Sequence, residues 1–86
     1  MDDTPLDFPR DHPLKVMGRH TPEFRAKVLA VLAAEADAAA GLRVEERLSR
    51  DGNFVSLTLT LRVASREQLD LIYRRLHATG LVLYAL

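Results

Sequence analysis

The sequence predicts an α+β domain in which two helices cover one face of a four-stranded antiparallel sheet. Three observations lead to this fold class. Two segments of alternating apolar and polar residues, 42–50 and 54–63, are joined by Asp51-Gly52, a strong signal for a two-residue hairpin. A helix-start signal with an apolar stripe occurs once before this hairpin and once after it. An uncharged segment at the end of the sequence supplies the fourth strand.

Residues 1–11 predict an irregular arm, because they are rich in aspartate and contain two of the four prolines. We expect its apolar side chains, Leu6 and Phe8, to pack loosely against the domain or to cover an edge of its sheet. Residues 12–86 form a single domain, since 86 residues suffice for one small core. This domain begins with a short strand over 12–18, whose two sides carry Leu14 and Val16 against Lys15 and Met17.

The first helix has a clear start and a clear end. Gly18 ends the strand, and Thr21-Pro22-Glu23 then begins a helix: Thr is a favoured cap, Pro fits the first turn, and the helix dipole stabilises Glu. Alanines continue the helix at little cost, and Gly41 should stop it. The apolar stripe of this helix consists of Phe24, Val28, Val31 and Leu32.

The hairpin specifies its own register. A two-residue loop at Asp51-Gly52 pairs Arg50 with Asn53, and this brings apolar residues opposite apolar ones and polar residues opposite polar ones. Glu46 is the one charged residue on the apolar side, so we expect it near an edge of the sheet. The apolar pairs are Leu48 with Val55, Val44 with Leu59 and Leu42 with Leu61; the polar pairs are Arg47 with Ser56, Glu45 with Thr58 and Arg43 with Thr60.

A second helix and a last strand follow the hairpin. Ser65 and Gln68 have the spacing of a capping box, and loss of the Ser65 cap should cost about 1 kcal/mol. Gly80 ends the helix, and "LVLYAL" at 81–86 predicts a strand that is apolar on both faces. The apolar stripe of the second helix consists of Leu69, Ile72, Tyr73 and Leu76.

The element order is strand, helix, strand, strand, helix, strand. With right-handed crossovers it predicts the ferredoxin-like split βαβ fold, with strand order 4-1-3-2 and both helices on one face. The aliphatic side of the strand at 54–63 then meets the helices, and its hydroxyl-bearing side lies on an open face. Burial of Thr58 or Thr60 beneath a helix, or exposure of Val55 or Leu59, would contradict this geometry.

Four stretches also point to a family when they are taken in order and spacing. They are "FP" at 8–9, "KVMG" at 15–18, "GNFVSLTLTL" at 52–61 and "SREQLDLIYRRL" at 65–76. Together they resemble the YbeD-like family of small bacterial proteins of unknown function. The resemblance implies a ferredoxin-like fold akin to ACT-type regulatory modules, which bind small ligands and pair side by side, and it implies no catalytic residues. Two positions depart from the family pattern: Phe54 stands where we expect Tyr, and Leu14 where an aromatic is common.

Composition argues against several functions. The chain has no cysteine, which excludes disulfides, thiolate metal sites and cysteine catalysis. Twelve basic residues balance twelve acidic ones, which disfavours general nucleic-acid binding. The longest apolar segment is far below the ~20 residues of a membrane-spanning helix, and the acidic start is no signal peptide. We therefore expect a soluble, cytoplasmic protein without a membrane partner.

Metal binding and catalysis are also disfavoured. His12 and His20 flank an extended segment and lie roughly 25 Å apart at ~3.3 Å per residue, so they cannot share an ion. The chain lacks the G-x-S-x-G pattern of many hydrolases. Glu45 and Glu46 are adjacent on a strand and point to opposite faces, so they cannot act as a paired acid and base. We expect no enzyme, no metal and no cofactor.

Three candidate sites remain. The loop Gly18, Arg19, His20 and Thr21 could hold an anion through helix-start N–H groups and basic side chains, in the region where ACT-type modules bind effectors. The last strand is uncharged at a predicted edge, where most strands are blunted by charge; its candidate residues are Val82, Leu83 and Tyr84. The open face is locally cationic; its candidate residues are Lys15, Met17, Arg43, Arg47, Phe54, Thr58, Thr60 and Arg62.

These sites support three alternative functions. The leading hypothesis is a non-enzymatic interaction or regulatory module that acts by protein–protein contact, with a partner or a second copy, through its sheet face or edge. The second is an ACT-like domain that senses a small-molecule effector. The third is a weak RNA-binding module, which shares the topology but would have only Phe54 as an aromatic on the central strands.

Overall fold

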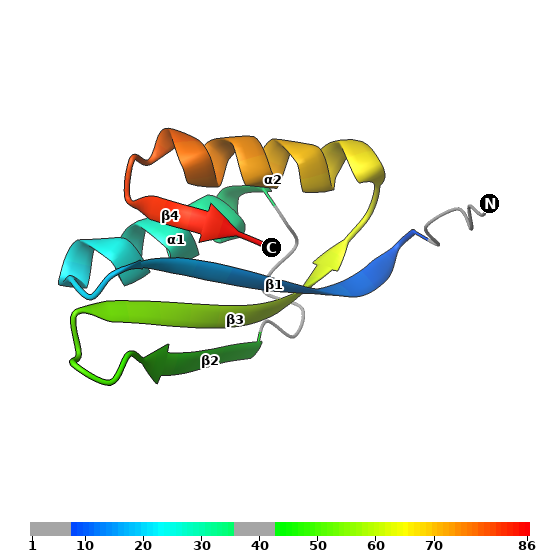
Figure 1. Ribbon diagram of the computed structural model, residues 1–86. Helices are drawn as coiled ribbons and strands as arrows, with labels where there is room; N and C mark the ends of the chain where they lie inside the picture. Colours follow the sequence, from blue (N-terminus) through cyan, green and yellow to red (C-terminus); the bar gives the residue numbers. More distant parts are fainter. Residues whose placement is uncertain (1–7, 36–42) are drawn as a thin grey trace.

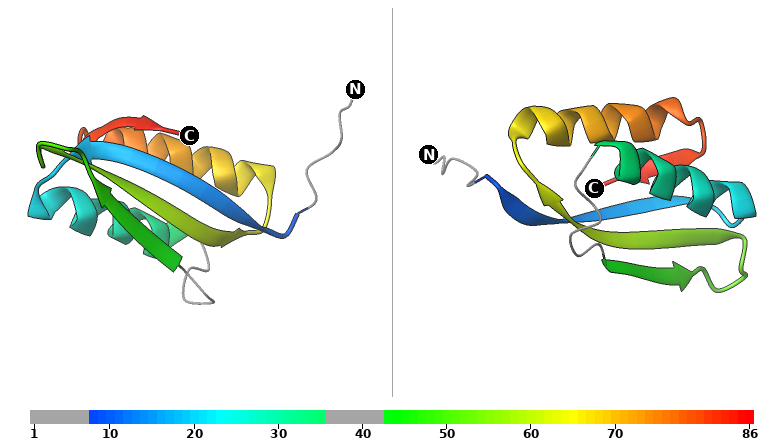
Figure 2. Two further views of the ribbon diagram at one scale, coloured as in Figure 1. Left: turned by 60° about the horizontal axis from the view of Figure 1, so that its bottom comes forward. Right: turned by 180° about the vertical axis from the view of Figure 1, so that it is seen from behind.

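The computed structural model describes residues 8–35 and 43–86, and its four-stranded antiparallel sheet has the order β2-β3-β1-β4. Both helices lie on the same face of this sheet (Figures 1 and 2). The predicted ferredoxin-like fold is therefore confirmed. In chain order the elements are β1 (Arg10–Arg19), α1 (Pro22–Glu35), β2 (Arg43–Leu48), β3 (Phe54–Val63), α2 (Arg66–Ala78) and β4 (Val82–Ala85).

The hairpin between β2 and β3 has the predicted register. Val44 lies opposite Leu59, and Arg47 lies opposite Ser56. Gly52 adopts φ +78°, a left-handed conformation that glycine enters without a steric penalty. Of the predicted pairs, the one that involves Leu42 lies outside the described residues. The loop differs from the predicted two-residue turn: the N–H of Gly52 donates to the carbonyl of Ser49 at 3.0 Å, and Asp51 does not have a positive φ, so the turn is centred on Arg50-Asp51. The alternation of side chains nevertheless aligned the two strands correctly.

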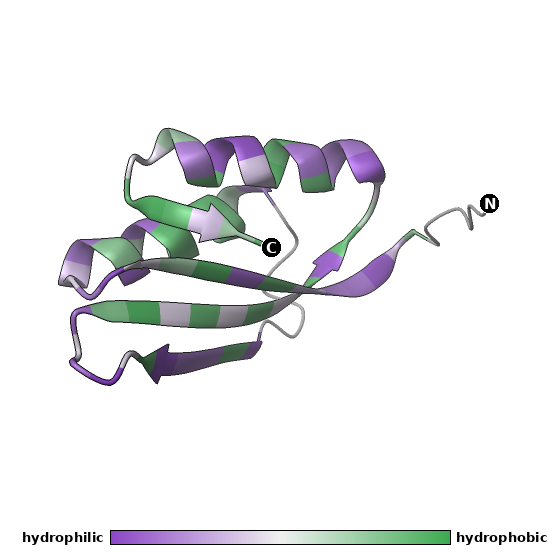
Figure 3. Ribbon diagram, in the orientation of Figure 1, coloured by the Kyte–Doolittle hydropathy of each residue, from purple (hydrophilic) through white to green (hydrophobic). Residues whose placement is uncertain are grey.

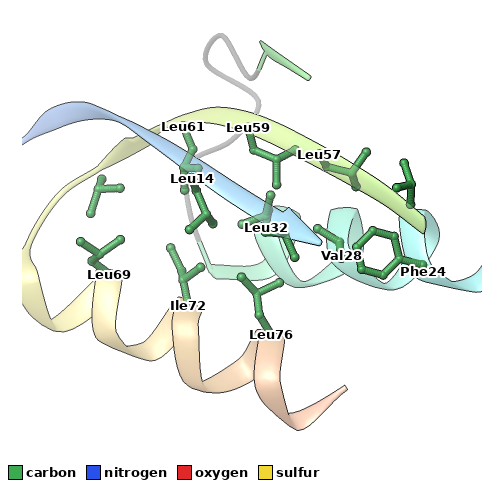
Figure 4. Packing of buried hydrophobic residues seen from close by; sticks show 13 residues of the cluster. Leu14, Phe24, Val28, Leu32, Leu57, Leu59, Leu61, Leu69, Ile72 and Leu76 are labelled. Atoms are coloured by element: carbon green, nitrogen blue, oxygen red, sulfur yellow. The ribbon is translucent and has the colours of Figure 1, made fainter. Parts of the chain in front are cut away.

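The core lies between the sheet and the helices. Every second residue of β3 points toward the helices, and Figure 4 shows Leu57, Leu59 and Leu61 facing the side chains of α1 and α2. Thr58 and Thr60 point to the opposite side and are partly exposed. The helical contribution to the core consists of Phe24, Val28 and Leu32 from α1 and Leu69, Ile72 and Leu76 from α2.

Both helix starts have the predicted caps. The backbone N–H of Phe24 donates to the Thr21 hydroxyl at 3.2 Å, and the N–H of Gln68 donates to the Ser65 hydroxyl at 3.1 Å. The Gln68 side chain accepts from the N–H of Ala64 at 2.7 Å, one residue before the position that a capping box would use. Its amide nitrogen also donates to the carbonyl of Glu35, which joins the start of α2 to the end of α1. The stop expected at Gly41 lies outside the described residues.

Strand boundaries differ from the prediction. β1 begins at Arg10, two residues earlier than expected, and it continues to Arg19 instead of ending at Gly18. Conversely, β4 covers only Val82–Ala85 of the predicted 81–86. Phe8, from the predicted arm, is half-buried and packs against the core, whereas Leu6 lies outside the described residues.

Gly18 is small for a reason that the sequence does not reveal. It lies inside β1 and is buried against Phe24 and Leu81. A Cβ atom at this position would stand 2.3 Å from the Phe24 ring and 2.6 Å from the Leu81 carbonyl oxygen, closer than real contacts allow. The glycine therefore allows α1 and the segment before β4 to approach β1 closely.

Candidate functional site: the open face, its edges and a cleft

The open face is the side of the sheet that no helix covers (Figure 2). The registers place a column of β3 residues at its centre, with the longer side chains of β1 and β2 on either side. Ser56 is only 6% exposed, and its cross-strand neighbours are the long side chains of Arg47 and Met17. The central column consists of Phe54, Ser56, Thr58, Thr60 and Arg62; the flanking residues include Asp11, Lys15, Met17 and Arg19 on β1 and Arg43, Glu45 and Arg47 on β2. All eight residues predicted for this face therefore lie on it.

Two basic side chains of the open face are held by neighbours. A guanidinium nitrogen of Arg62 lies 3.3 Å from a carboxylate oxygen of Asp11, across the β1–β3 pair. The guanidinium of Arg19 lies over the ring of Phe54, 5.5 Å from its centroid, which is the geometry of a cation–π contact. Phe54 is consequently half-buried and has one side of its ring occupied.

The margin of this face at β4 is apolar. Tyr84 and Leu86, which pair with Met17 and Lys15, lie on the open-face side and are 41% and 70% exposed. Leu83 points to the other side of β4, near Thr21 and Glu23, and is 57% exposed. Leu86 continues the pairing with β1 beyond the end of the strand, because it exchanges two backbone hydrogen bonds with Lys15, of 2.8 and 3.0 Å. Backbone polar groups of successive strand residues point to opposite sides, so those of Ala85 point away from β1. β4 thus presents apolar side chains together with an unpaired backbone edge.

A cleft of about 470 Å³ lies on the helix side of the sheet, between the start of α1 and the edge strand β2. Its floor is apolar and its rim is charged. At the rim, a guanidinium nitrogen of Arg25 lies 2.7 Å from a carboxylate oxygen of Glu46. The cleft is lined by His20, Thr21, Pro22, Arg25, Glu46, Val55 and Leu57.

The four residues predicted as an anion-binding loop do not act as one group. Gly18 is buried, and Arg19 lies on the open face over Phe54. His20 and Thr21 line the cleft, but the Thr21 hydroxyl is engaged as the cap of α1. The ring Nδ1–H of His20 donates to the carbonyl of Gly52 at 3.2 Å, which ties this loop to the hairpin turn.

Arg25 and Glu46 were not among the predicted site residues. The sequence held one signal for them, since Glu46 was the only charged residue on the apolar side of its strand. The structure explains the misfit: β2 is an edge strand, and Glu46 faces Arg25 of α1 at its outer rim. Nothing in the sequence alone identifies Arg25 as the partner.

Within residues 8–35 and 43–86, no three histidine, aspartate or glutamate side chains gather as metal ligands would, and no helix there is long and apolar enough to cross a membrane.

Partial burial, together with the nearby charge of Arg10, lowers the pKa of His12 below its ordinary value. The guanidinium of Arg10 donates to Nδ1 of His12 at 2.9 Å, which requires that this nitrogen carry no proton.

The sequence matches the family model described as "Protein of unknown function (DUF493)" over residues 3–86. The chain belongs to this family. It is 43% identical over 77 residues to a UPF0250 protein of Bordetella parapertussis, covering 90% of this chain and 85% of that protein. A UPF0250 protein of Paraburkholderia phytofirmans is 45% identical over 71 residues, covering 83% of this chain and 80% of that protein. The predicted resemblance to the YbeD-like proteins is thereby confirmed.

Solved structures with the same fold are much more distant in sequence. Protein HP0495 from H. pylori is similar with a TM-score of 0.71 at 14% identity, over 98% of this chain and 88% of that one. The ACT domain from the GTP pyrophosphokinase of Chlorobium tepidum gives a TM-score of 0.65 at 13% identity, over 90% and 97% of the two chains. At these identities the similarity establishes the fold alone.

Proposed function

We propose that this protein is a non-enzymatic, regulatory interaction module that binds a protein partner through the open face of its sheet and the β4 margin. The observation that carries the proposal is the apolar margin, where Tyr84 and Leu86 remain exposed on the uncovered face and Leu83 is exposed on the other side of the same edge strand. A four-residue strand buries too little surface by itself, since a stable interface needs about 1,000 Å² or more in total. The open face must therefore contribute to the contact.

The placement of the carboxylates supports a non-enzymatic function. Glu45 lies on the open face, whereas Glu46 points to the helix side and is paired with Arg25. These adjacent carboxylates cannot converge on one substrate. A module that binds through a broad surface requires no such convergence, because exposed apolar area and complementary charge provide its affinity and specificity.

A photo-crosslinking amino acid placed in the full-length protein tests this proposal in its native cells. It is introduced at Thr58, at the centre of the open face, and in a control at Arg74, which is exposed on α2. We expect defined adducts from Thr58 and few from Arg74. Absence of adducts from Thr58, or the same adducts from both positions, contradicts the proposal. An adduct with twice the mass of the protein identifies a second copy as the partner.

The cleft supports a second candidate function, the sensing of a small-molecule effector. Its volume is within the range of small-ligand pockets, and a buried apolar floor of Val55 and Leu57 lies below the Arg25–Glu46 pair. The rim offers a cation for a ligand carboxylate and a carboxylate for a ligand ammonium group. The structural similarity to the ACT domain of a GTP pyrophosphokinase agrees with such a function without assigning a ligand.

Thermal-shift measurements with amino acids and acidic metabolites test the second candidate. A ligand that binds only the folded state raises the melting temperature, by an amount that grows with its concentration. The shift should disappear in Arg25→Ala and persist in Arg74→Ala, which changes an exposed arginine far along the chain. No shift with any of these compounds, or an equal shift in both variants, contradicts ligand binding in the cleft.

A further inference from the structure

The open face is positively charged although the chain as a whole is neutral. The protein has twelve basic and twelve acidic residues. On the open face the basic residues outnumber the acidic ones: Lys15, Arg19, Arg43, Arg47 and Arg62 stand against Asp11 and Glu45. The two helices together carry four acidic and five basic residues, so they are close to neutral and do not share this excess. The fold therefore concentrates positive charge on the side of the sheet that no helix covers.

Three of these basic side chains are available to a partner. Arg62 is paired with Asp11, and Arg19 lies over Phe54. Lys15, Arg43 and Arg47 are exposed, and none of them forms an ion pair within the part of the chain that the structure describes. Apart from Asp11, Glu45 on β2 is the only acidic side chain that the described strands place on this face.

The spacing of these cations indicates the size of the ligand. Lys15 and Arg47 stand on β1 and β2, on either side of β3, so their strands are about 10 Å apart. Arg43 and Arg47 are four residues apart on one strand, a separation of about 13 Å. A single small anion cannot contact all three cations, whereas an extended polypeptide segment can. Met17 and Tyr84, which lie opposite each other on β1 and β4, offer apolar surface next to the cations.

We propose that the open face binds an acidic protein segment, whose carboxylates pair with Lys15, Arg43 and Arg47 and whose apolar side chains lie on Met17 and Tyr84. This inference rests on the proposed function and specifies the chemistry of its partner. The contact joins complementary charges, which steer association and select the partner. Apolar contact at the β4 margin adds affinity, because it removes exposed apolar surface from water.

Charge and aromatic content argue against the other occupants. A second copy docked face to face would bring like charges together, which is costly at an interface. Single-stranded RNA is read by bases stacked on several aromatic side chains of a sheet. Among the described residues of the two central strands, Phe54 is the only aromatic on this face, and Arg19 already occupies one side of its ring.

The experiment uses three fluorescent probes and the full-length protein. The first probe is a peptide in which glutamates flank one phenylalanine and one leucine, the second replaces its glutamates by lysines, and the third is oligouridylate. Fluorescence anisotropy measures their binding to the wild type, to Lys15→Glu/Arg47→Glu on the open face, and to Lys27→Glu/Arg74→Glu on the helices. Circular dichroism of each variant verifies that the fold is retained.

We expect the acidic peptide to bind the wild type, the lysine peptide not to bind, and added salt to weaken the complex. The open-face double variant should lose about tenfold or more in affinity, and the helix variant should stay within about twofold. Equal loss in both variants, or no binding of the acidic peptide, overturns the inference. If Thr58 still yields adducts in that case, the proposed function stands with a partner of different chemistry; if it yields none, both fall. Binding of oligouridylate alone, with dependence on Lys15 and Arg47, replaces the acidic segment by RNA.

Discussion

The two edges of the sheet differ in how they are protected. Four of the six residues of β2 are charged, and β4 has no charged residue, a contrast visible as purple against green in Figure 3. An edge strand exposes unpaired N–H and C=O groups, which invite pairing with another chain. β2 prevents this with charge on both sides, including Glu46, which points inward to Arg25. β4 is protected only by its shortness and by an irregular register against β1.

This contrast between the edges indicates where a contact surface can lie. Charge at the β2 edge makes burial there costly unless the partner supplies opposite charge, because ionic groups lose their hydration when they are covered. Apolar side chains at β4 lose no comparable hydration free energy when a partner covers them. The apolar margin also borders β1, which carries Lys15, whereas β2 carries Arg43 and Arg47 at the opposite side of the same face. A partner could therefore anchor on β4 and reach across the face toward the cations of β2.

The largest expected effect comes from Gly18, which allows α1 and the segment before β4 to pack closely against β1. In Gly18→Ala, the new Cβ atom would meet the Phe24 ring and the Leu81 carbonyl. Such overpacking usually costs 1–3 kcal/mol, and a backbone group cannot yield easily, so we expect a loss of about 3 kcal/mol in unfolding free energy. Urea denaturation measures it. In a Phe24→Leu background the loss should shrink, because one of the two clashes is relieved; an equal loss in both backgrounds would contradict this cause.

The second prediction removes the protection of the β2 edge. Glu46→Val makes the helix-facing side of β2 apolar throughout, so we expect concentration-dependent self-association by light scattering. Unfolding free energy should fall by less than about 1 kcal/mol, because the ion pair with Arg25 is partly exposed. Glu46→Gln, which keeps a polar group at the edge, should remain as monodisperse as the wild type. If both variants behave alike, the inward charge does not protect this edge.

The third prediction adds charge to the unprotected edge. Leu86 is 70% exposed, so Leu86→Glu should change unfolding free energy by less than about 0.5 kcal/mol. The same change should lower the yield of adducts from a crosslinker at Thr58 several-fold, because a carboxylate at the β4 margin must lose hydration when a partner covers it and repels an acidic one. Ala33→Glu, on the exposed side of α1, is the control and should leave the yield unchanged. An unaltered yield in both variants would exclude β4 from the contact.

Much of the fold could be predicted because local signals agreed with one another. The turn at Asp51-Gly52 and the alternation of β3 each specified the same register, and the caps Thr21 and Ser65 each marked a helix start. Such agreement between turn chemistry, periodicity and capping leaves few topologies open. The ends of β1 and β4 were less predictable, since pairing with a neighbour extends or shortens a strand without a local sequence signal.

The candidate site was only partly predictable, because it depends on which distant residues meet. Alternation alone placed all eight predicted residues on the open face. Alternation did not predict the loop before α1. Gly18 is buried, Arg19 lies over Phe54 on β3, and only His20 and Thr21 line the cleft. These outcomes depend on contacts between residues far apart in the chain, which no local pattern encodes.

The smallest expected effect is a local loss of stability in acid, which should occur beside β2 and not beside β4. Asp51 accepts a hydrogen bond from the backbone N–H of Asn53 at 3.0 Å and one from the Ser49 hydroxyl at 2.8 Å. These bonds, that from Asn53 first, lower the pKa of Asp51 below its ordinary value of 3.8. The folded state therefore favours the carboxylate. Its stabilising effect is present above pH 3.8 and is lost as the pH falls through the lowered pKa.

Hydrogen exchange can detect this loss locally, because Asp51 lies in the turn that holds β2 to β3. The N–H of Ser49, bonded to the Phe54 carbonyl, should lose protection in acid relative to the N–H of Leu86, bonded to the Lys15 carbonyl beside β4. The effect should be small, since the carboxylate is exposed to solvent. Asp51→Asn removes the titrating group and should abolish the difference between the two amides. If that variant retains the difference, the acid sensitivity of the β2 edge arises elsewhere in the hairpin, and the turn does not distinguish β2 from β4.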